Sequence, residues 1–493
     1  KVSTVAVIGA GIGGLSTAIR AAAAGRKVTL FEAGPEVGGK LRQLHLGDYR
    51  FDLGPSLFTW PALLQDTLAS AGPNAAPFDF LKLDRSCHYF WPDGTRFTAW
   101  SDRTKLTEEI QTTFGMDPEP VLQHLDSSQR GFEATRALFL EQSLHESSNW
   151  RPKVALPHIR KALKSWRDLP LTRKLNDWNR KTGHPQLQQL FNRYATYNGS
   201  DPFRAPAMLH VIPHLEFGMG TFAPIGGMHA IVDALHRTAL NLGVDIRTNA
   251  PVEQIQVSSG RVQGVVHSGN QTFEASVVVS GADVTPTYQK LLKGHGQPHR
   301  ILNAEPSTSG VIFYWGMQHS APELHLHNIL WAQDYKAEFQ ALFAGKTIAE
   351  DPTVYINIGS KTSPEDAPEG AGNWFVMVNA PAGWDPQGID DLRQRIEKKI
   401  EAMTGIHVAE HRVCEHILTP KDIAARTGSH QGALYGPASN APLSAFLRQR
   451  NRDRRIKGLY FAGGSVHPGG GIPLCLLSGR ITHELMTQHD PIQ

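Results

Sequence analysis

The stretch that most constrains the fold of this chain is "VAVIGAGIGGLSTAIRAAAAGRKVTLFEAG", residues 5–34. Its first four residues are apolar, which is typical of a strand buried on both faces of a sheet. Gly9, Gly11 and Gly14 follow with G-x-G-x-x-G spacing, and an alanine-rich stretch up to Gly25 predicts a helix that ends there. "KVTLF" predicts a second strand that ends beside Glu32. Strand, glycine turn, helix, strand and acid together predict an α/β fold that binds a dinucleotide.

Each of these residues has a physical reason to stand where it does. The first glycine lets the chain turn, the second lets a pyrophosphate approach the backbone, and the third lets helix and strand pack closely. The helix N-terminus offers unpaired N–H groups to the phosphates. Glu32 is placed to grip a ribose diol, and its negative charge argues against a 2′-phosphate. The alternative is a tight turn in an unrelated α/β protein.

Composition excludes several other classes of protein. The 493 residues suffice for two or more domains, and the net charge of +3 implies no nucleic-acid partner. The three cysteines are far apart in the chain, so we expect neither a disulfide framework nor a zinc site. His325 and His327 alternate as on one strand face; an exposed pair is favoured over a metal site because no third ligand is in register. The sequence has no apolar run of about 18 residues, so we expect no transmembrane helix.

A second glycine-rich segment follows the first within a few residues. Gly38 and Gly39 precede Lys40 and Arg42, and an apolar-alternating stretch then leads to Gly54, Pro55 and Ser56. This segment resembles the second glycine signature of two-dinucleotide-binding flavoproteins: the amine oxidases, the Rab GDP-dissociation inhibitors and the carotenoid desaturases. The resemblance implies FAD, bound by an α/β, Rossmann-like domain that is joined to a mixed-sheet substrate domain.

The other end of the chain carries a third glycine-rich segment, "GLYFAGGSVHPGGGIPLCLLSGR", residues 458–480. With "FDLGPSLF" and "GALYGPASNAPLSAF" it resembles the bacterial phytoene desaturase-type enzymes. The resemblance implies a strand that leads to the flavin and a helix whose N-terminus faces the flavin's carbonyl edge. Many relatives have an acid after "FAG", whereas here the residue is Gly464, so backbone groups must serve. The further contacts implied are Val252 near the adenine, Asp283 near the cofactor, and Gly463, Gly464, Gly471, Ile472 and Pro473 around the flavin.

The family implies an FAD-dependent desaturase that introduces double bonds into a long polyene, with hydride transfer to flavin N5. The residues "GGSVHPGGGIPL" of the C-terminal segment favour the subgroup that acts on 1-hydroxylated carotenoids. No side chain is assigned as a catalytic base, and His467 is a candidate for shaping the flavin edge. The alternatives are an amine-oxidase-type flavoenzyme, a carotenoid isomerase or saturase, and a non-enzymatic prenyl-lipid carrier.

The resemblance also implies a discontinuous architecture. We expect the FAD-binding domain to comprise residues 1–80, 220–290 and 415–493. The substrate domain would then comprise 81–219 and 291–414, with 115–200 mainly helical.

One basic segment, residues 150–181, stands apart from the rest. It contains ten Lys and Arg and two Asp, a local charge of +8, with Trp150, Trp166 and Trp178 interleaved. Basic residues with tryptophans at their edge are typical of a segment that lies on an anionic bilayer. We therefore expect a cytoplasmic protein that binds a membrane surface peripherally through this segment. The alternative is a solvated basic face with structural tryptophans.

Overall fold

The glycine-rich start of the chain folds as predicted. In the computed structural model, β1 (Thr4–Ile8) leads through the glycine turn into α1 (Ile12–Ala23), and β2 (Lys27–Phe31) returns parallel to β1. A Cβ atom added at Gly14 would lie 2.1 Å from the Gly9 carbonyl oxygen, so only glycine lets the helix pack this closely on the turn. The structure describes residues 4–144, 146, 149, 156–157, 160, 166–170, 172–441, 444 and 448–492.

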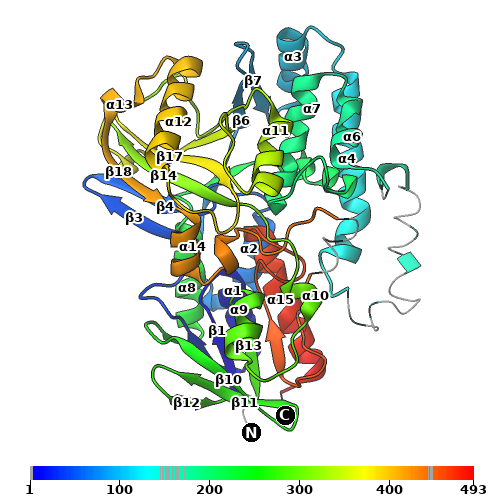
Figure 1. Cartoon of the computed structure of the whole chain (residues 1–493). Helices are drawn as coiled ribbons and strands as arrows, with labels where there is room; N and C mark the ends of the chain where they lie inside the picture. The colour runs from blue at the N-terminus through cyan, green and yellow to red at the C-terminus, as the bar shows by residue number, and fades with distance from the viewer. Residues whose placement is uncertain are drawn as a thin grey trace.

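The parallel sheet around β1 draws its strands from three distant parts of the chain. Its order is β19-β13-β1-β2-β9, and all four pairings are parallel. On one face, α1 packs with α8 and α15 over a shared apolar core, and the N- and C-termini lie close together below the sheet (Figure 1). The other face carries an antiparallel sheet of β10, β11 and β12. The added bounds are β9 (Asp245–Arg247), β10 (Val252–Ser258), β11 (Arg261–His267), β12 (Gln271–Glu274), β13 (Val277–Ser280), β19 (Leu459–Phe461), α8 (Ala230–Asn241) and α15 (Ile472–His489).

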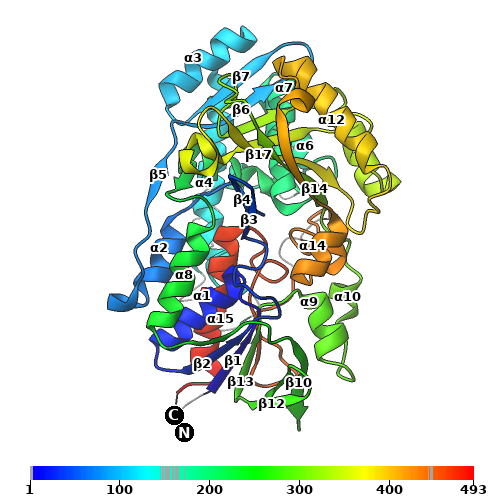
Figure 2. The ribbon, with the colours of Figure 1, turned by 90° about the vertical axis from the view of Figure 1, so that its left-hand side faces the viewer.

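A seven-stranded sheet lies above the parallel sheet (Figures 1 and 2), with the order β18-β14-β17-β16-β15-β6-β7. Its pairings are antiparallel except between β15 and β6. β14 and β17 form its longest pairing, with nine residues of each strand in register. The bounds are β6 (Arg85–Phe90), β7 (Arg96–Trp100), β14 (Ser309–Met317), β15 (His327–Leu330), β16 (Val354–Ile358), β17 (Gly372–Ala380) and β18 (Arg412–Leu418).

Helices cover the seven-stranded sheet on its outer side and at its β7 end. Three apolar side chains of α12, Leu392, Ile396 and Ile400, pack on β14, β16 and β17. A second core under β6 and β7 receives side chains from α3, α4, α7 and α11. The bounds are α3 (Arg103–Phe114), α4 (Glu119–Phe139), α6 (Leu175–Asn179), α7 (Pro185–Asn192), α11 (Tyr335–Gln340), α12 (Ile389–Thr404), α13 (Val408–His411) and α14 (Pro420–Thr427).

Small elements complete the two regions and join them. A hairpin of β3 and β4 extends from the second glycine-rich segment, and β5 pairs with β8 where the chain passes between the sheets. β18 crosses the boundary predicted between residues 414 and 415, because it pairs with β14 along its whole length. The bounds are β3 (Arg42–Leu46), β4 (Tyr49–Leu53), β5 (Phe80–Lys82), β8 (Phe222–Pro224), α2 (Ala62–Ala69), α9 (Val284–Pro286) and α10 (His299–Leu302). Among the described residues, no helix is long and apolar enough to cross a membrane.

Candidate active site

A cavity of about 900 Å³ reaches from the parallel sheet to the seven-stranded sheet. At one end it meets the carboxyl ends of β1, β2 and β13, where Ile8, Phe31 and Gly281 line it. Ligands bind at this edge in open parallel α/β sheets. At the other end, residues of β14, β15, β16 and β17 line the same cavity.

The first glycine loop and Glu32 lie together at the lower end. Gly9, Gly11 and Glu32 line the cavity, whereas Gly14 does not and serves the packing of α1. No side chain caps the start of α1, so its N-terminal N–H groups are left for a ligand. The Glu32 carboxylate is 8% exposed; it accepts the Ala10 N–H at 2.9 Å and the Gly34 N–H at 2.8 Å. These two bonds hold the carboxylate in one orientation.

The second glycine segment lies against the first. A Cβ atom at Gly39 would lie 3.0 Å from the Gly11 Cα atom, so the two loops touch through glycines. Gly38, Gly39 and Gly54 have positive φ angles, and a Cβ atom at Gly54 would lie 2.2 Å from the Lys40 carbonyl oxygen. All seven residues predicted from this segment line the cavity: Gly38, Gly39, Lys40, Arg42, Gly54, Pro55 and Ser56.

The two predicted cations of this segment have different partners. An Arg42 Nη atom lies 3.8 Å from the Glu32 carboxylate. The Lys40 Nζ atom instead donates to the carbonyls of Ala433 and Leu434, at 3.0 and 2.7 Å. Burial lowers the Lys40 pKa. Lys40 therefore ties the second glycine segment to a strand-free stretch almost 400 residues further along the chain.

The C-terminal glycine segment closes the cavity from a third side. Gly463, Gly464, Gly471, Ile472 and Pro473 line it, as do Val252 and Asp283. The helix α15 begins at Ile472. Its N-cap residue is Gly471, which has a φ of +95°, so no side chain caps the first N–H groups of the helix. The Asp283 carboxylate caps α9 through the Thr285 N–H and also accepts the His430 N–H at 3.1 Å. Its role in the structure is thus to join two backbone segments at the cavity wall.

His467 is the one predicted site residue whose side chain points away from the cavity. Its neighbour Pro468 lines the cavity, but the imidazole is 1% exposed and its Nε2 atom lies 2.9 Å from the Gln142 carbonyl oxygen. The structure therefore does not bring His467 to the predicted flavin edge. The side chain instead contacts the segment that follows the long helix α4, which ends at Phe139.

Arg448 lines the cavity and was not predicted. Its guanidinium donates to the carbonyls of Tyr435, Pro437 and Gly464 at 2.7, 2.9 and 3.2 Å. Burial lowers its pKa to about 10, and the structure shows no salt bridge from it to a carboxylate within the described residues. A lone Arg in an irregular segment carries no sequence motif, so only the three-dimensional structure reveals this buried positive charge.

The residues at the lower end fit an FAD molecule. The glycine contacts leave space where any Cβ atom would collide, which suits close approach of a pyrophosphate and a flavin. Glu32 supplies a buried acceptor for ribose hydroxyls, while the half-buried Lys40 and the buried Arg448 supply positive charge. When bound, FAD would supply a hydride acceptor at this point of the cavity.

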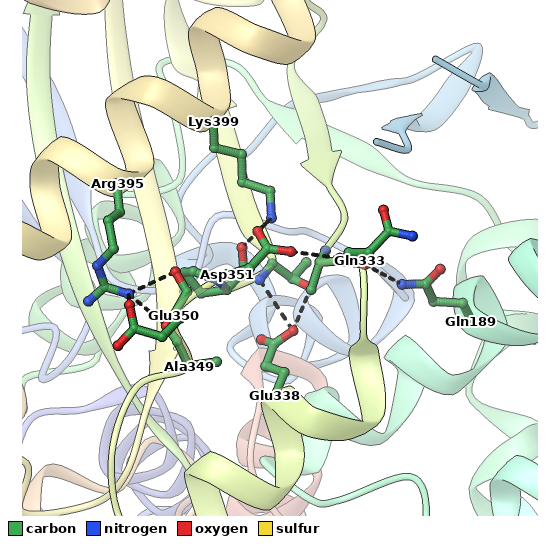
Figure 3. A network of polar contacts seen from close by, with 11 residues as sticks. Gln189, Gln333, Glu338, Ala349, Glu350, Asp351, Arg395 and Lys399 are labelled. Atoms are coloured by element: carbon green, nitrogen blue, oxygen red, sulfur yellow. Dashed lines mark hydrogen bonds and ion pairs between the residues drawn. The ribbon is translucent and has the colours of Figure 1, made fainter. Parts of the chain in front are cut away.

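The upper end of the cavity is mainly apolar. Ile312, Phe375, Met377, Leu418 and Ile423 line it. Some polar side chains also line the cavity, among them Arg193, Glu216, His327, Thr353 and Asn379. The Thr353 hydroxyl donates to the buried Glu338 carboxylate at 2.6 Å. Figure 3 shows that this contact belongs to a network in which Asp351 binds Lys399 of α12 and the Gln333 N–H. The network fixes the wall in place behind Thr353.

Two predictions about exposed residues are wrong. Trp178 is 4% exposed, with the Lys181 Nζ atom 3.3 Å from its ring centre and His210 at its edge, so it is not free to enter a bilayer. Trp150 lies outside the described residues, and so do the side chain of Trp166 and most of 150–165. His327 is 3% exposed, because the face of β15 that carries it is covered and lines the cavity. Within the described residues no group of His, Cys, Asp and Glu has the geometry of a metal site.

The parallel sheet with its three converging glycine segments, joined to a second sheet by one shared cavity, defines a flavin-dependent oxidoreductase. A profile of flavin-containing amine oxidoreductases matches residues 12–482. The chain belongs to this family and, within it, to the carotenoid desaturases, and FAD is its cofactor.

Three similar proteins of known name support this assignment. A 1-hydroxycarotenoid 3,4-desaturase of Flavobacterium sp. (strain P99-3) is 45% identical over 97% of this chain and 98% of its own length. A 4,4'-diapolycopene oxygenase of Methylomonas sp is 31% identical over 97% of both chains, and a phytoene desaturase of Fusarium fujikuroi is 30% identical over 98% of this chain and 88% of its own length.

Solved structures show the same fold at much lower identity. An oxidoreductase from Methanosarcina mazei superposes with a TM-score of 0.62 at 16% identity, over 98% of this chain and 100% of its own. Putrescine oxidase superposes with a TM-score of 0.63 at 15% identity, over 99% of both chains.

Proposed function

We propose that this protein is a carotenoid desaturase that takes two hydrogens from the C3–C4 single bond of a 1-hydroxylated carotenoid. The observation that carries the proposal is the continuity of the cavity. Glycine loops suited to FAD form one end, and apolar residues of the seven-stranded sheet form the other, so a long polyene can reach the flavin. The position of the bond and the hydroxyl come from the relative that is 45% identical.

The side chains around the cavity would act mainly by positioning. Ile312, Phe375 and Met377 present an apolar wall that holds a polyene and excludes water. The glycines of the second and third segments allow the backbone to lie close to the flavin, so that a C–H bond is held in line for transfer. We assign FAD contacts to the residues that line the lower end, and no catalytic base to any side chain.

The test uses the FAD-loaded protein and liposomes that contain a panel of carotenoids. Under anaerobic conditions we expect bleaching of the flavin absorbance together with a red shift of the polyene spectrum. A parallel sample with putrescine in place of the carotenoid tests for amine oxidation, because putrescine oxidase shares the fold. Bleaching by putrescine and by no carotenoid would overturn the proposal in favour of an amine oxidase.

We also propose that the basic segment 150–181 attaches the protein to an anionic membrane surface. Its described basic side chains at Arg167, Arg173, Lys174 and Arg180 are exposed. Each basic residue near such a surface contributes about 1 kcal/mol. Since Trp178 is buried, the attachment would depend more on charge, and therefore on salt, than the sequence alone suggests.

Co-sedimentation with anionic liposomes tests this attachment. One variant changes Lys161, Lys164, Arg167, Arg173 and Lys174 to Glu. A control variant changes five exposed lysines elsewhere, and so matches the first in charge: Lys27, Lys336, Lys346, Lys398 and Lys421. We expect only the first variant to stay in the supernatant; equal sedimentation of the two would refute the proposal.

A further inference from the structure

His327 is a buried polar side chain in the upper, mainly apolar part of the cavity. It begins β15, is 3% exposed and lines the cavity. Its Nδ1 atom lies 2.8 Å from the Tyr355 hydroxyl, which in turn lies 2.8 Å from the Ser56 hydroxyl. This chain of contacts connects His327 to the second glycine segment, two residues after Gly54.

The contacts of the ring determine which nitrogen carries the proton. The Asn357 side-chain N–H donates to the Leu326 carbonyl at 3.1 Å, which fixes the orientation of the amide. The same Nδ2 atom lies 3.2 Å from His327 Nδ1, so Nδ1 faces a donor and must accept. Burial lowers the pKa of His327 to about 3, so the ring is neutral and its single proton is on Nε2.

The Nε2–H group has no hydrogen-bond partner among the described residues. The nearby Arg193 cannot provide one, because a guanidinium only donates; it binds Glu216 and the Tyr89 hydroxyl. Buried N–H groups in proteins are nearly always paired, so an unpaired donor that lines a cavity points to an acceptor on the ligand.

We propose that His327 Nε2–H donates a hydrogen bond to the oxygen on the substrate's end group and thereby selects an oxygenated polyene over a hydrocarbon. The proposal rests on the proposed function and adds to it a specificity-determining residue. A hydroxyl on C1 is separated from the C3–C4 bond by C2 alone, so the group that binds it must lie near the reacting bond. The link through Tyr355 to Ser56 ties His327 to the glycine segment at the flavin end.

Two substitutions separate the cavity-facing nitrogen from the structural one. His327→Asn keeps an acceptor near the Nδ1 position for Tyr355 and removes the Nε2 donor. His327→Gln places an amide N–H near the Nε2 position. His325→Asn is the matched control, because His325 is half-buried, contacts Arg85 and does not line the cavity.

The experiment compares a 1-hydroxylated polyene with its unhydroxylated counterpart in liposomes. It measures kcat/KM by flavin bleaching and, without turnover, binding of each polyene to the FAD-loaded protein by quenching of tryptophan fluorescence. We expect wild type to favour the hydroxylated polyene by roughly 10- to 100-fold, the effect of pairing a buried donor. The preference should fall to about threefold or less in His327→Asn, and persist in His327→Gln and His325→Asn.

The outcomes distinguish this inference from the proposed function. An equal preference in wild type and His327→Asn overturns the role of His327 and leaves the desaturase assignment intact. The absence of turnover on both polyenes overturns the proposed function. In that case the binding measurement still tests the role of His327. Loss of preferential binding of the hydroxylated polyene in His327→Asn supports a hydrogen bond from Nε2–H, and an unchanged preference refutes it.

Discussion

Replacement of Glu32 by Gln should weaken FAD binding without removing the side chain. A charged acceptor makes hydrogen bonds worth about 1.5–3 kcal/mol, against about 0.5–1.5 kcal/mol for a neutral one. Two ribose hydroxyls would therefore lose roughly 2–3 kcal/mol in all, which is about a 30- to 150-fold higher Kd for FAD. The Glu32 oxygens also accept the Ala10 and Gly34 N–H groups, so the Gln amide must turn its own N–H toward one of these donors. That conflict adds to the loss. Glu32→Ala would be a less clean test, because it removes the acceptor of both N–H groups.

The assay is titration of apoprotein with FAD, followed by quenching of flavin fluorescence. Glu36→Gln is the matched control, because Glu36 is exposed and does not line the cavity. Thermal melting of both apoproteins separates binding from folding. A Kd for Glu32→Gln within twofold of wild type would refute the assignment of Glu32 to the ribose.

Three further predictions concern other parts of the structure. Gly14→Ala places a Cβ atom 2.1 Å from the Gly9 carbonyl oxygen, so α1 must move, and chemical denaturation should show a loss of about 1–3 kcal/mol or more. Burial raises the pKa of Glu338 from 4.5 to about 7, so the folded state holds this proton more tightly than the unfolded state does. The free energy of unfolding should therefore fall by up to roughly 3 kcal/mol as the pH rises from about 4.5 to 7. Glu338→Gln should flatten this pH dependence of Tm. Arg448→Met removes buried positive charge beside Gly464, so spectroelectrochemistry should show a flavin potential lower by roughly 20–40 mV, and an unchanged potential would place that charge away from the flavin.

The lower region could be predicted from sequence because its constraints are local. A turn that needs Gly14, or an N-terminal strand that leads into a helix, is determined by residues a few positions apart. The order of the seven-stranded sheet could not be predicted in the same way. β15 pairs parallel with β6, about 240 residues earlier, and nothing in the short sequence of β15 indicates that partner.

The same limit separates the predicted site residues from the missed ones. The glycines can be recognised in the sequence, because a close approach of two backbone segments tolerates no other residue. Arg448 and His327 have no such signature, since their roles depend on carbonyls and side chains brought from other segments. The sequence predicts an exposed His327, because alternation along a strand identifies a face but not whether that face is covered.

The three glycine segments also explain why the two ends of the chain must meet before the cofactor site exists. Gly39 packs against Gly11, and a Cβ atom at Gly13 would lie 2.7 Å from the Gly463 backbone. The second and third glycine segments therefore both pack directly against the first. Lys40 adds a tie from the second segment to the carbonyls of residues 433 and 434. A ligand that contacts all three segments binds only the assembled state, and such a ligand stabilises that state in proportion to its affinity and concentration. If FAD contacts all three segments, as we propose, its binding would hold the N-terminal and C-terminal segments together as well as place the redox group between them.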